Sequence, residues 1–179
     1  MITWIALFRA INVGGRNTLP MKELTDVLAK LGLSDIRTYI QSGNVVFRTS
    51  QHDRGALTAK IREAVHSSHG FPPATILLEA EELAQAITAN PFPAAAAEPK
   101  SLHLYFLAQP PAPDLAALNA LKASSEAFAI VGQVFYLHAP QGISRSKLAA
   151  GAEKRLGVET TARNWRTVNK VLALAREIA

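Results

Sequence analysis

The order of segments repeats along the chain, and this repetition limits the possible folds more than any single motif does. Residues 2–8 form a near-continuous apolar run, as expected for a strand covered on both faces. The segments predicted to follow are a helix opened by Pro20 and ended by Gly32, two strands at 36–41 and 44–48 joined by the two-residue turn Ser42-Gly43, a helix capped by Asp53, and a strand at 75–78. A short helix with Glu79, Glu81 and Glu82 at its start comes next.

The same order returns in the second half. Residues 102–107 predict a strand, Pro113-Asp114 opens a helix, and 127–131 and 134–138 form a hairpin. The predicted helix at 145–156, the strand at 158–160 and a closing helix to residue 178 complete the series. Gly132 in the second hairpin turn lies 89 positions after Gly43 in the first. The sequence therefore predicts an α+β fold of two tandem ferredoxin-like (βαββαβ) units with antiparallel sheets, formed by duplication, plus a C-terminal helix.

A proline-rich segment divides the two halves. Residues 90–99 hold three prolines and an alanine run, which do not continue a strand. We expect a first unit over 1–90, a linker over 91–100, and a second unit with the C-terminal helix over 101–179.

Composition excludes several classes of protein. With 49% apolar and 18% charged residues among 179, the chain is neither a disordered tail nor a coiled coil. It has no cysteine for disulfides or thiolate chemistry. A signal peptide is not expected, because no basic region followed by a long apolar run begins the chain, and no stretch approaches the length of a membrane span. The expected location is the cytoplasm.

The net charge of +5 gathers near the C-terminus. Residues 143–179 hold eight Lys or Arg against three Glu, a balance that equals the net charge of the whole chain. Such a region suits RNA, a phosphorylated metabolite, or solubility alone.

Four polar stretches interrupt the alanine- and leucine-rich sequence. The first, residues 9–17, pairs Gly14 and Gly15 between Arg9 and Arg16, which suits an anion. The second, residues 39–44, has the composition of a hairpin turn as well as of a polar site.

The third and fourth stretches, residues 142–147 and 160–167, each place a hydroxyl at a predicted helix start. Each also places cations in the first turn, where the helix dipole is already positive. A bound phosphate or carboxylate would make this arrangement favourable. The alternative is that the cations point into solvent or pair with Glu153 and Glu159. Trp165 falls on an apolar stripe and is expected to pack in the core.

The polar stretches lack the residues of common hydrolases. None contains Asp, Glu or Cys, so no metal site and no pair of catalytic carboxylates is predicted. His138 is the one imidazole placed to act as a general base, although ordinary packing is the commoner role for such a residue. Any enzymatic role would be group transfer assisted by the substrate or by a metal, and the sequence names no cofactor.

The motifs together resemble the bacterial family called domain of unknown function 1697. The matching stretches are residues 9–15, 38–47, 90–93, 146–148 and 161–167. Members of this family look like two tandem ferredoxin-like units, and the resemblance implies no particular activity. Ala10 departs from the family, which usually has glycine there.

These features predict that the chain binds a small anionic ligand, phosphate- or nucleotide-like, in a cleft between the two units. The candidate ligand-binding residues are Arg9, Asn12, Gly14, Gly15, Gln41, Ser42, Asn44, Ser146, Lys147, Arg163 and Asn164. Arg145 would add charge. The alternatives are an RNA- or DNA-binding module, or an interaction protein without a ligand; no membrane partner is expected. The RNA alternative is weakened because Phe8, Tyr105 and Phe106 lack the flanking basic residues of RNA-binding strands.

Overall fold

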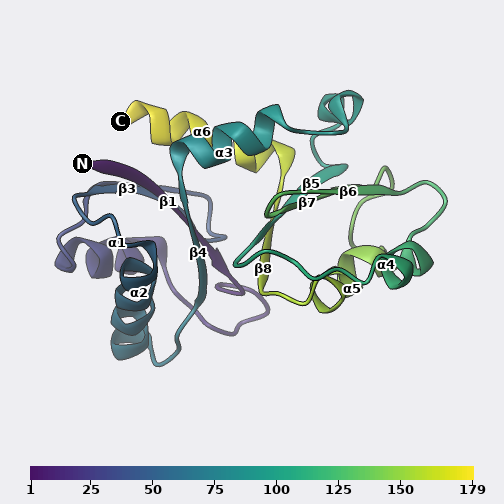
Figure 1. Ribbon diagram of the computed structural model, residues 1–179. Coiled ribbons are helices and arrows are strands. Elements are labelled where there is room, and N and C mark those ends of the chain that lie inside the picture. The colour runs from purple at the N-terminus through teal and green to yellow at the C-terminus, as the bar shows by residue number, and fades with distance from the viewer. The chain divides into compact units, whose positions relative to one another are not determined.

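The computed structural model describes all residues, 1–179, and groups them into two compact units. The first consists of residues 1–84 and 170–179, and the second of residues 85–169. Figure 1 labels most of the helices and strands of both. No helix has the length and apolar character that a membrane-spanning segment needs.

The first unit follows the order strand–helix–strand–strand–helix–strand. Its elements are β1 (Ile2–Arg9), α1 (Met21–Lys30), β2 (Ser34–Tyr39), β3 (Asn44–Thr49), α2 (Arg54–His69) and β4 (Ala74–Glu79). The sheet has the order β2-β3-β1-β4 with every neighbouring pair antiparallel. The apolar run of β1 is therefore a central strand, which explains why Trp4 to Phe8 are all buried.

Side chains from this sheet and its two helices form the core of the first unit. Trp4, Phe8 and Phe47 from the strands pack with Leu24 and Ile61 from α1 and α2. The predicted cap of α2 is confirmed, since Oδ1 of Asp53 accepts a hydrogen bond from the backbone N–H of Ala56 at 2.9 Å.

The second unit repeats this order. Its elements are the short 3₁₀ helix η1 (Pro93–Ala97), β5 (Leu102–Leu107), α4 (Leu115–Leu121), β6 (Ala127–Val131), β7 (Val134–His138), α5 (Lys147–Leu156) and β8 (Thr160–Asn164). The sheet has the order β6-β7-β5-β8, again entirely antiparallel. Its core joins Tyr105 and Phe135 of the central strands to Leu118 of α4 and Leu148 of α5.

Two helices complete the chain, α3 (Ala80–Thr88) and α6 (Trp165–Glu177). The division between the units falls inside both, after residue 84 and after residue 169. The predicted boundaries at 90 and 101 differ from this division, which groups residues 170–179 with the first unit. Trp165 is only partly buried, whereas Val168, Leu172 and Ala175 of the same helix are buried.

The first hairpin turn differs from its prediction. Register pairs Tyr39 with Asn44, so four residues, 40–43, connect β2 and β3 instead of two. Gly43, with φ of 76°, lies so close to β1 that a Cβ there would stand 2.7 Å from Cβ of Phe8. The backbone N–H of Phe8 donates to the Gly43 carbonyl at 2.8 Å. Tertiary contact with β1, rather than a local two-residue turn, therefore sets this connection.

The last strand also differs from its prediction. β8 covers residues 160–164, not 158–160, because each of these residues pairs with one of residues 103–107 on β5. Helix α6 consequently begins at Trp165. The hydroxyls of Thr160 and Thr161 thus precede the helix, and Oδ1 of Asn164 accepts the hydrogen bond from the N–H of Thr167 at 2.9 Å instead.

Candidate functional site

In the first unit, the side chain of Asn12 braces two loops against each other. Its Nδ2 donates to the carbonyls of Leu19 at 2.8 Å and Gln41 at 2.9 Å. Its Oδ1 accepts from the N–H of Leu19 at 2.7 Å. Asn12 adopts a positive φ of 56°, which asparagine tolerates better than most residues. The amide therefore holds the loop after β1 to the β2–β3 turn.

The glycine loop itself lies open to solvent. Val13 and Arg16 form an isolated antiparallel bridge, so Gly14 and Gly15 are the tip of a very short hairpin with φ of 60° and 72°. Arg9, at the end of β1, and Arg16 are both exposed. The prediction that this loop, with its flanking cations, suits an anion stays a prediction.

The β2–β3 turn contains one buried and two exposed candidates. Asn44 is 1% exposed, and its Nδ2 donates to the carbonyl of Tyr39 at 3.1 Å and to Oγ of Ser42 at 3.0 Å. Gln41 and Ser42 are exposed. Asn44 thus closes the turn from inside, in the same way that Asn12 braces it from the neighbouring loop.

In the second unit, Arg163 lies on β8 and not in the first turn of α6. Its Nη1 donates to Oγ1 of Thr161 at 2.9 Å and to the carbonyl of Ala162 at 2.8 Å. Burial lowers the pKa of Arg163 to about 10. The prediction that Arg163 adds like charge to the start of the last helix is wrong, because β8 continues as far as Asn164.

The start of α5 agrees with its prediction only in part, because the helix begins at Lys147 and not at residue 145. Oγ of Ser146 accepts from the N–H of Ala149 at 2.9 Å, so this serine is the N-cap. Lys147 is the first helical residue and is exposed. Arg145 is also exposed but precedes the cap, so only one of the two cations lies in the first turn.

Beside this helix start lies a hollow of about 650 Å³. We call it the basic hollow, and it is lined by residues 120–123, 125, 126, 141, 142 and 144–147. Its cations are Lys122, Arg145 and Lys147. None of the three forms an ion pair, although Nζ of Lys122 donates to the backbone carbonyl of Glu126 at 3.2 Å.

The same hollow contains a carboxylate that the sequence reasoning missed. Glu126 lines it and is 8% exposed. Its Oε2 accepts from the backbone N–H of Ala123 at 2.9 Å. A signal existed in the sequence, because Glu126 is the one acidic residue between Asp114 and Glu153.

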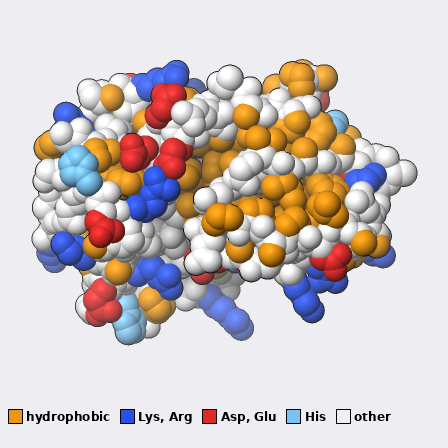
Figure 2. All heavy atoms as spheres, in the orientation of Figure 1, with side chains coloured by type: hydrophobic (Ala, Val, Ile, Leu, Met, Phe, Trp, Pro, Cys, Tyr) orange, Lys and Arg blue, Asp and Glu red, His pale blue; other side chains and the backbone are white.

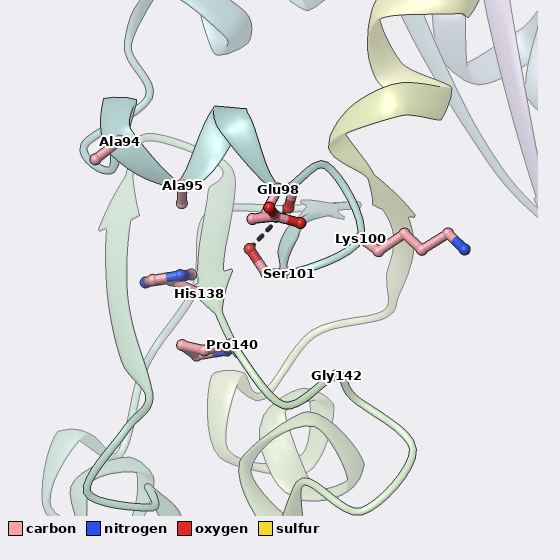
Figure 3. Close-up of a pocket in the computed structure, with 8 residues that line it drawn as sticks. All are labelled: Ala94, Ala95, Glu98, Lys100, Ser101, His138, Pro140 and Gly142. Atoms are coloured by element: carbon pink, nitrogen blue, oxygen red, sulfur yellow. Dashed lines mark hydrogen bonds between the residues drawn. The ribbon is translucent and has the colours of Figure 1, made fainter.

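A second cavity, of about 340 Å³, lies in the same unit. Its lining consists of Ala94, Ala95, Glu98, Lys100, Ser101, His138, Pro140 and Gly142 (Figure 3). Oγ of Ser101 donates to the carbonyl of Glu98 at 2.8 Å, and Lys100 extends away from the other labelled side chains. His138 packs near the ring of Phe92, at 6.1 Å between ring centres. Neither the hydroxyl of Ser101 nor the carboxylate of Glu98 is hydrogen-bonded to His138, so this cavity contains no pair of nucleophile and general base.

No group of three His, Asp or Glu side chains is placed to hold a metal ion. The aromatic side chains of the central strands, Phe8, Tyr105 and Phe106, are all buried. They therefore offer no exposed stacking surface for nucleic-acid bases.

Comparison with other proteins shows a likeness to one protein family and to a solved structure. A family model described as a protein of unknown function (DUF1697) matches residues 1–136. The chain is also similar to the solved structure of the conserved bacterial protein SP0830 from Streptococcus pneumoniae, with 25% identity and a TM-score of 0.73 over 97% of this chain and 98% of that one. Among curated proteins, none matches the sequence.

Proposed function

We propose that this chain, which belongs to the DUF1697 family of proteins of unknown function, binds a small anionic ligand. The proposed binding site is the basic hollow of the second unit. The observation that carries this proposal is the set of three cations around one cavity. Lys122, Arg145 and Lys147 line it without forming an ion pair to any carboxylate. With Glu126 included, the lining has a formal charge of +2.

The helix beside the hollow adds to the attraction. The first backbone N–H groups of α5, at Lys147 and Leu148, have no acceptor within the helix. The helix dipole places partial positive charge at the same end. A phosphate or carboxylate near Ser146 would therefore meet both charged side chains and unsatisfied N–H groups.

The size of the hollow favours a small molecule over a polymer. About 650 Å³ lies within the usual range for pockets that take metabolites. On the face drawn in Figure 2, Lys and Arg side chains are interspersed with Asp and Glu rather than forming a continuous basic stripe. These features, with the buried aromatics of the central strands, support a small ligand as the first candidate and nucleic acid as the second.

The test is a thermal-shift series with inorganic phosphate, pyrophosphate, citrate and mononucleotides. The variants are Arg145→Ala, Lys147→Ala and the double variant. Lys154→Ala is the matched control, since it removes one exposed charge from the other end of α5. A probe at about 100 times its Kd should stabilise the folded chain by about 2.7 kcal/mol.

We expect at least one probe to raise the melting temperature of the unaltered protein and of Lys154→Ala. The shift should be lost in the double variant and shrink with added salt. If no probe raises the melting temperature, the protein is not an anion-binding one. If the shift survives in the double variant, the basic hollow is not the site. A response to oligonucleotides alone would favour the nucleic-acid alternative.

We further propose that both units are ferredoxin-like and arose by duplication. The support is that the strand–helix–strand–strand–helix–strand order from β1 to β4 returns from β5 to β8, and that the two sheets have corresponding strand orders. Fold likeness of this kind does not itself indicate a ligand.

A further inference from the structure

Glu126 is a buried carboxylate without a cationic partner. Glu126 is 8% exposed, and its carboxylate forms no ion pair. One oxygen, Oε2, accepts the N–H of Ala123, and the other accepts no hydrogen bond. The residue as a whole is buried, but the oxygen without a hydrogen bond is reached by solvent, so a cation in the hollow has access to it.

The three cations that line the hollow do not form an ion pair with the carboxylate of Glu126. Lys122 directs its Nζ to the backbone carbonyl of Glu126, at 3.2 Å, and not to the carboxylate. Arg145 and Lys147 line the hollow as well, yet neither forms an ion pair with Glu126. The basic hollow therefore presents separated charges of both signs.

The charge of Glu126 acts on the interior of the second unit. Burial, and to a smaller degree this carboxylate, raise the pKa of the Tyr105 hydroxyl to about 12. Tyr105 is a core residue of the central strand β5. The carboxylate thus lies where the core and the hollow meet.

We propose that the ligand of the basic hollow is a small zwitterion, with a phosphate or carboxylate held by Arg145 and Lys147 and a protonated primary amine held by Glu126. This inference rests on the proposed function. An ammonium group would supply the missing countercharge to Glu126 and up to three N–H donors. A ligand with an anionic group alone would leave Glu126 uncompensated and would be repelled by it.

Calorimetric titration with matched probes tests the inference. O-phosphoethanolamine carries a primary amine that ethyl phosphate lacks, and both carry a phosphate. Glutamate likewise carries an amine that glutarate lacks, and both carry two carboxylates. In at least one pair, we expect the unaltered protein to bind the amine-bearing member about tenfold more tightly than the amine-free member. This is the effect expected of one well-placed ion pair. Because this comparison needs no variant, it stands even where a substitution impairs folding.

Glu126→Gln identifies the group responsible. The amide oxygen still accepts from the N–H of Ala123, while the charge is removed. We expect the advantage of the amine-bearing probe to fall below about threefold and the affinity for ethyl phosphate to stay constant or rise. Glu159→Gln is the control, because it removes an exposed charge from the same unit.

The outcomes separate this inference from the proposal beneath it. If ethyl phosphate binds as tightly as O-phosphoethanolamine, and glutarate as tightly as glutamate, anion binding stands and the zwitterion is wrong. If the amine advantage persists in Glu126→Gln, Glu126 does not hold the amine and the inference fails. If no probe of either pair binds while phosphate, pyrophosphate, citrate or a mononucleotide still gives a thermal shift, the zwitterion is wrong; if none of these binds either, the proposed function itself is contradicted.

Discussion

At residues 12 and 44 the family motifs place asparagines whose side chains are engaged with the fold itself. Asn12 makes three hydrogen bonds to the backbone of Leu19 and Gln41, and the amide of Asn44 bonds Tyr39 and Ser42. Both were predicted to bind ligand. A motif asparagine that shapes a loop and one that binds ligand have the same appearance in sequence, since both need an amide beside a turn.

His103 is a residue whose ionisation should affect stability. It lies on the central strand β5, is 8% exposed, and its Nδ1 has no hydrogen-bond partner. Burial lowers its pKa from 6.5 to about 4. The unfolded chain therefore binds more protons than the folded one between these pH values. This contribution to stability is complete above pH 6.5 and is lost as the pH falls towards 4.

We expect the free energy of unfolding to decrease by up to about 3 kcal/mol across that interval because of His103. Urea unfolding of His103→Leu, measured from pH 7 to 4, should show a flatter dependence than the unaltered protein. His66→Leu is the control, because that imidazole is half exposed, and it should keep the full slope. An unchanged acid dependence in His103→Leu would contradict this assignment.

At the scale of single elements, the ends of helices and strands were harder to predict from the sequence than their presence. Every helix and strand expected from the sequence is present, but β8 extends to Asn164 and the first hairpin has a four-residue connection. Pairing with a strand from a distant part of the chain decides where β8 ends. Apolar periodicity within the segment does not contain that information.

The start of α5 allows the capping role of Ser146 to be separated from ligand binding. Ser146→Ala removes the acceptor for the N–H of Ala149 and should reduce the free energy of unfolding by about 1 kcal/mol. Ser146→Asp keeps an acceptor and should be close to the unaltered protein in stability. Its added negative charge in the basic hollow should, however, reduce any shift produced by phosphate. Chemical unfolding and thermal shift measure the two effects, and equal phosphate shifts in both variants would argue against the proposed site.

At the scale of the whole molecule, the grouping of residues does not follow the order of the chain. Residues 170–179 belong to the first unit although they follow the second in sequence. The buried residues of this segment are Val171, Leu172, Ala175 and Ile178. The sequence placed them with the second unit because they directly continue it. Helix α6 was read as one element of one unit, whereas the division passes through it.

Substituting Ile178 tests this grouping. Ile178→Asp places a charge at a buried position and should reduce the free energy of unfolding by about 3 kcal/mol or more. Hydrogen exchange should show the greater loss of protection in residues 1–84. Ala173→Asp, at an exposed position of α6 within the same segment 170–179, is the control and should change little. A larger loss of protection in residues 85–169 would contradict the grouping.

The sequence alone determined the elements and their repeated order, because apolar period, capping residues and turn residues are local properties. It also indicated a serine cap at the start of α5, since the cap oxygen and the N–H that donates to it lie only three residues apart, although the helix begins two residues later than predicted. Tertiary structure decided the extent of β8, the bracing roles of Asn12 and Asn44, and the placement of Glu126 beside Lys122, Arg145 and Lys147. Such placements depend on which distant backbone segments come together, and burial then determines which charges are left without a partner.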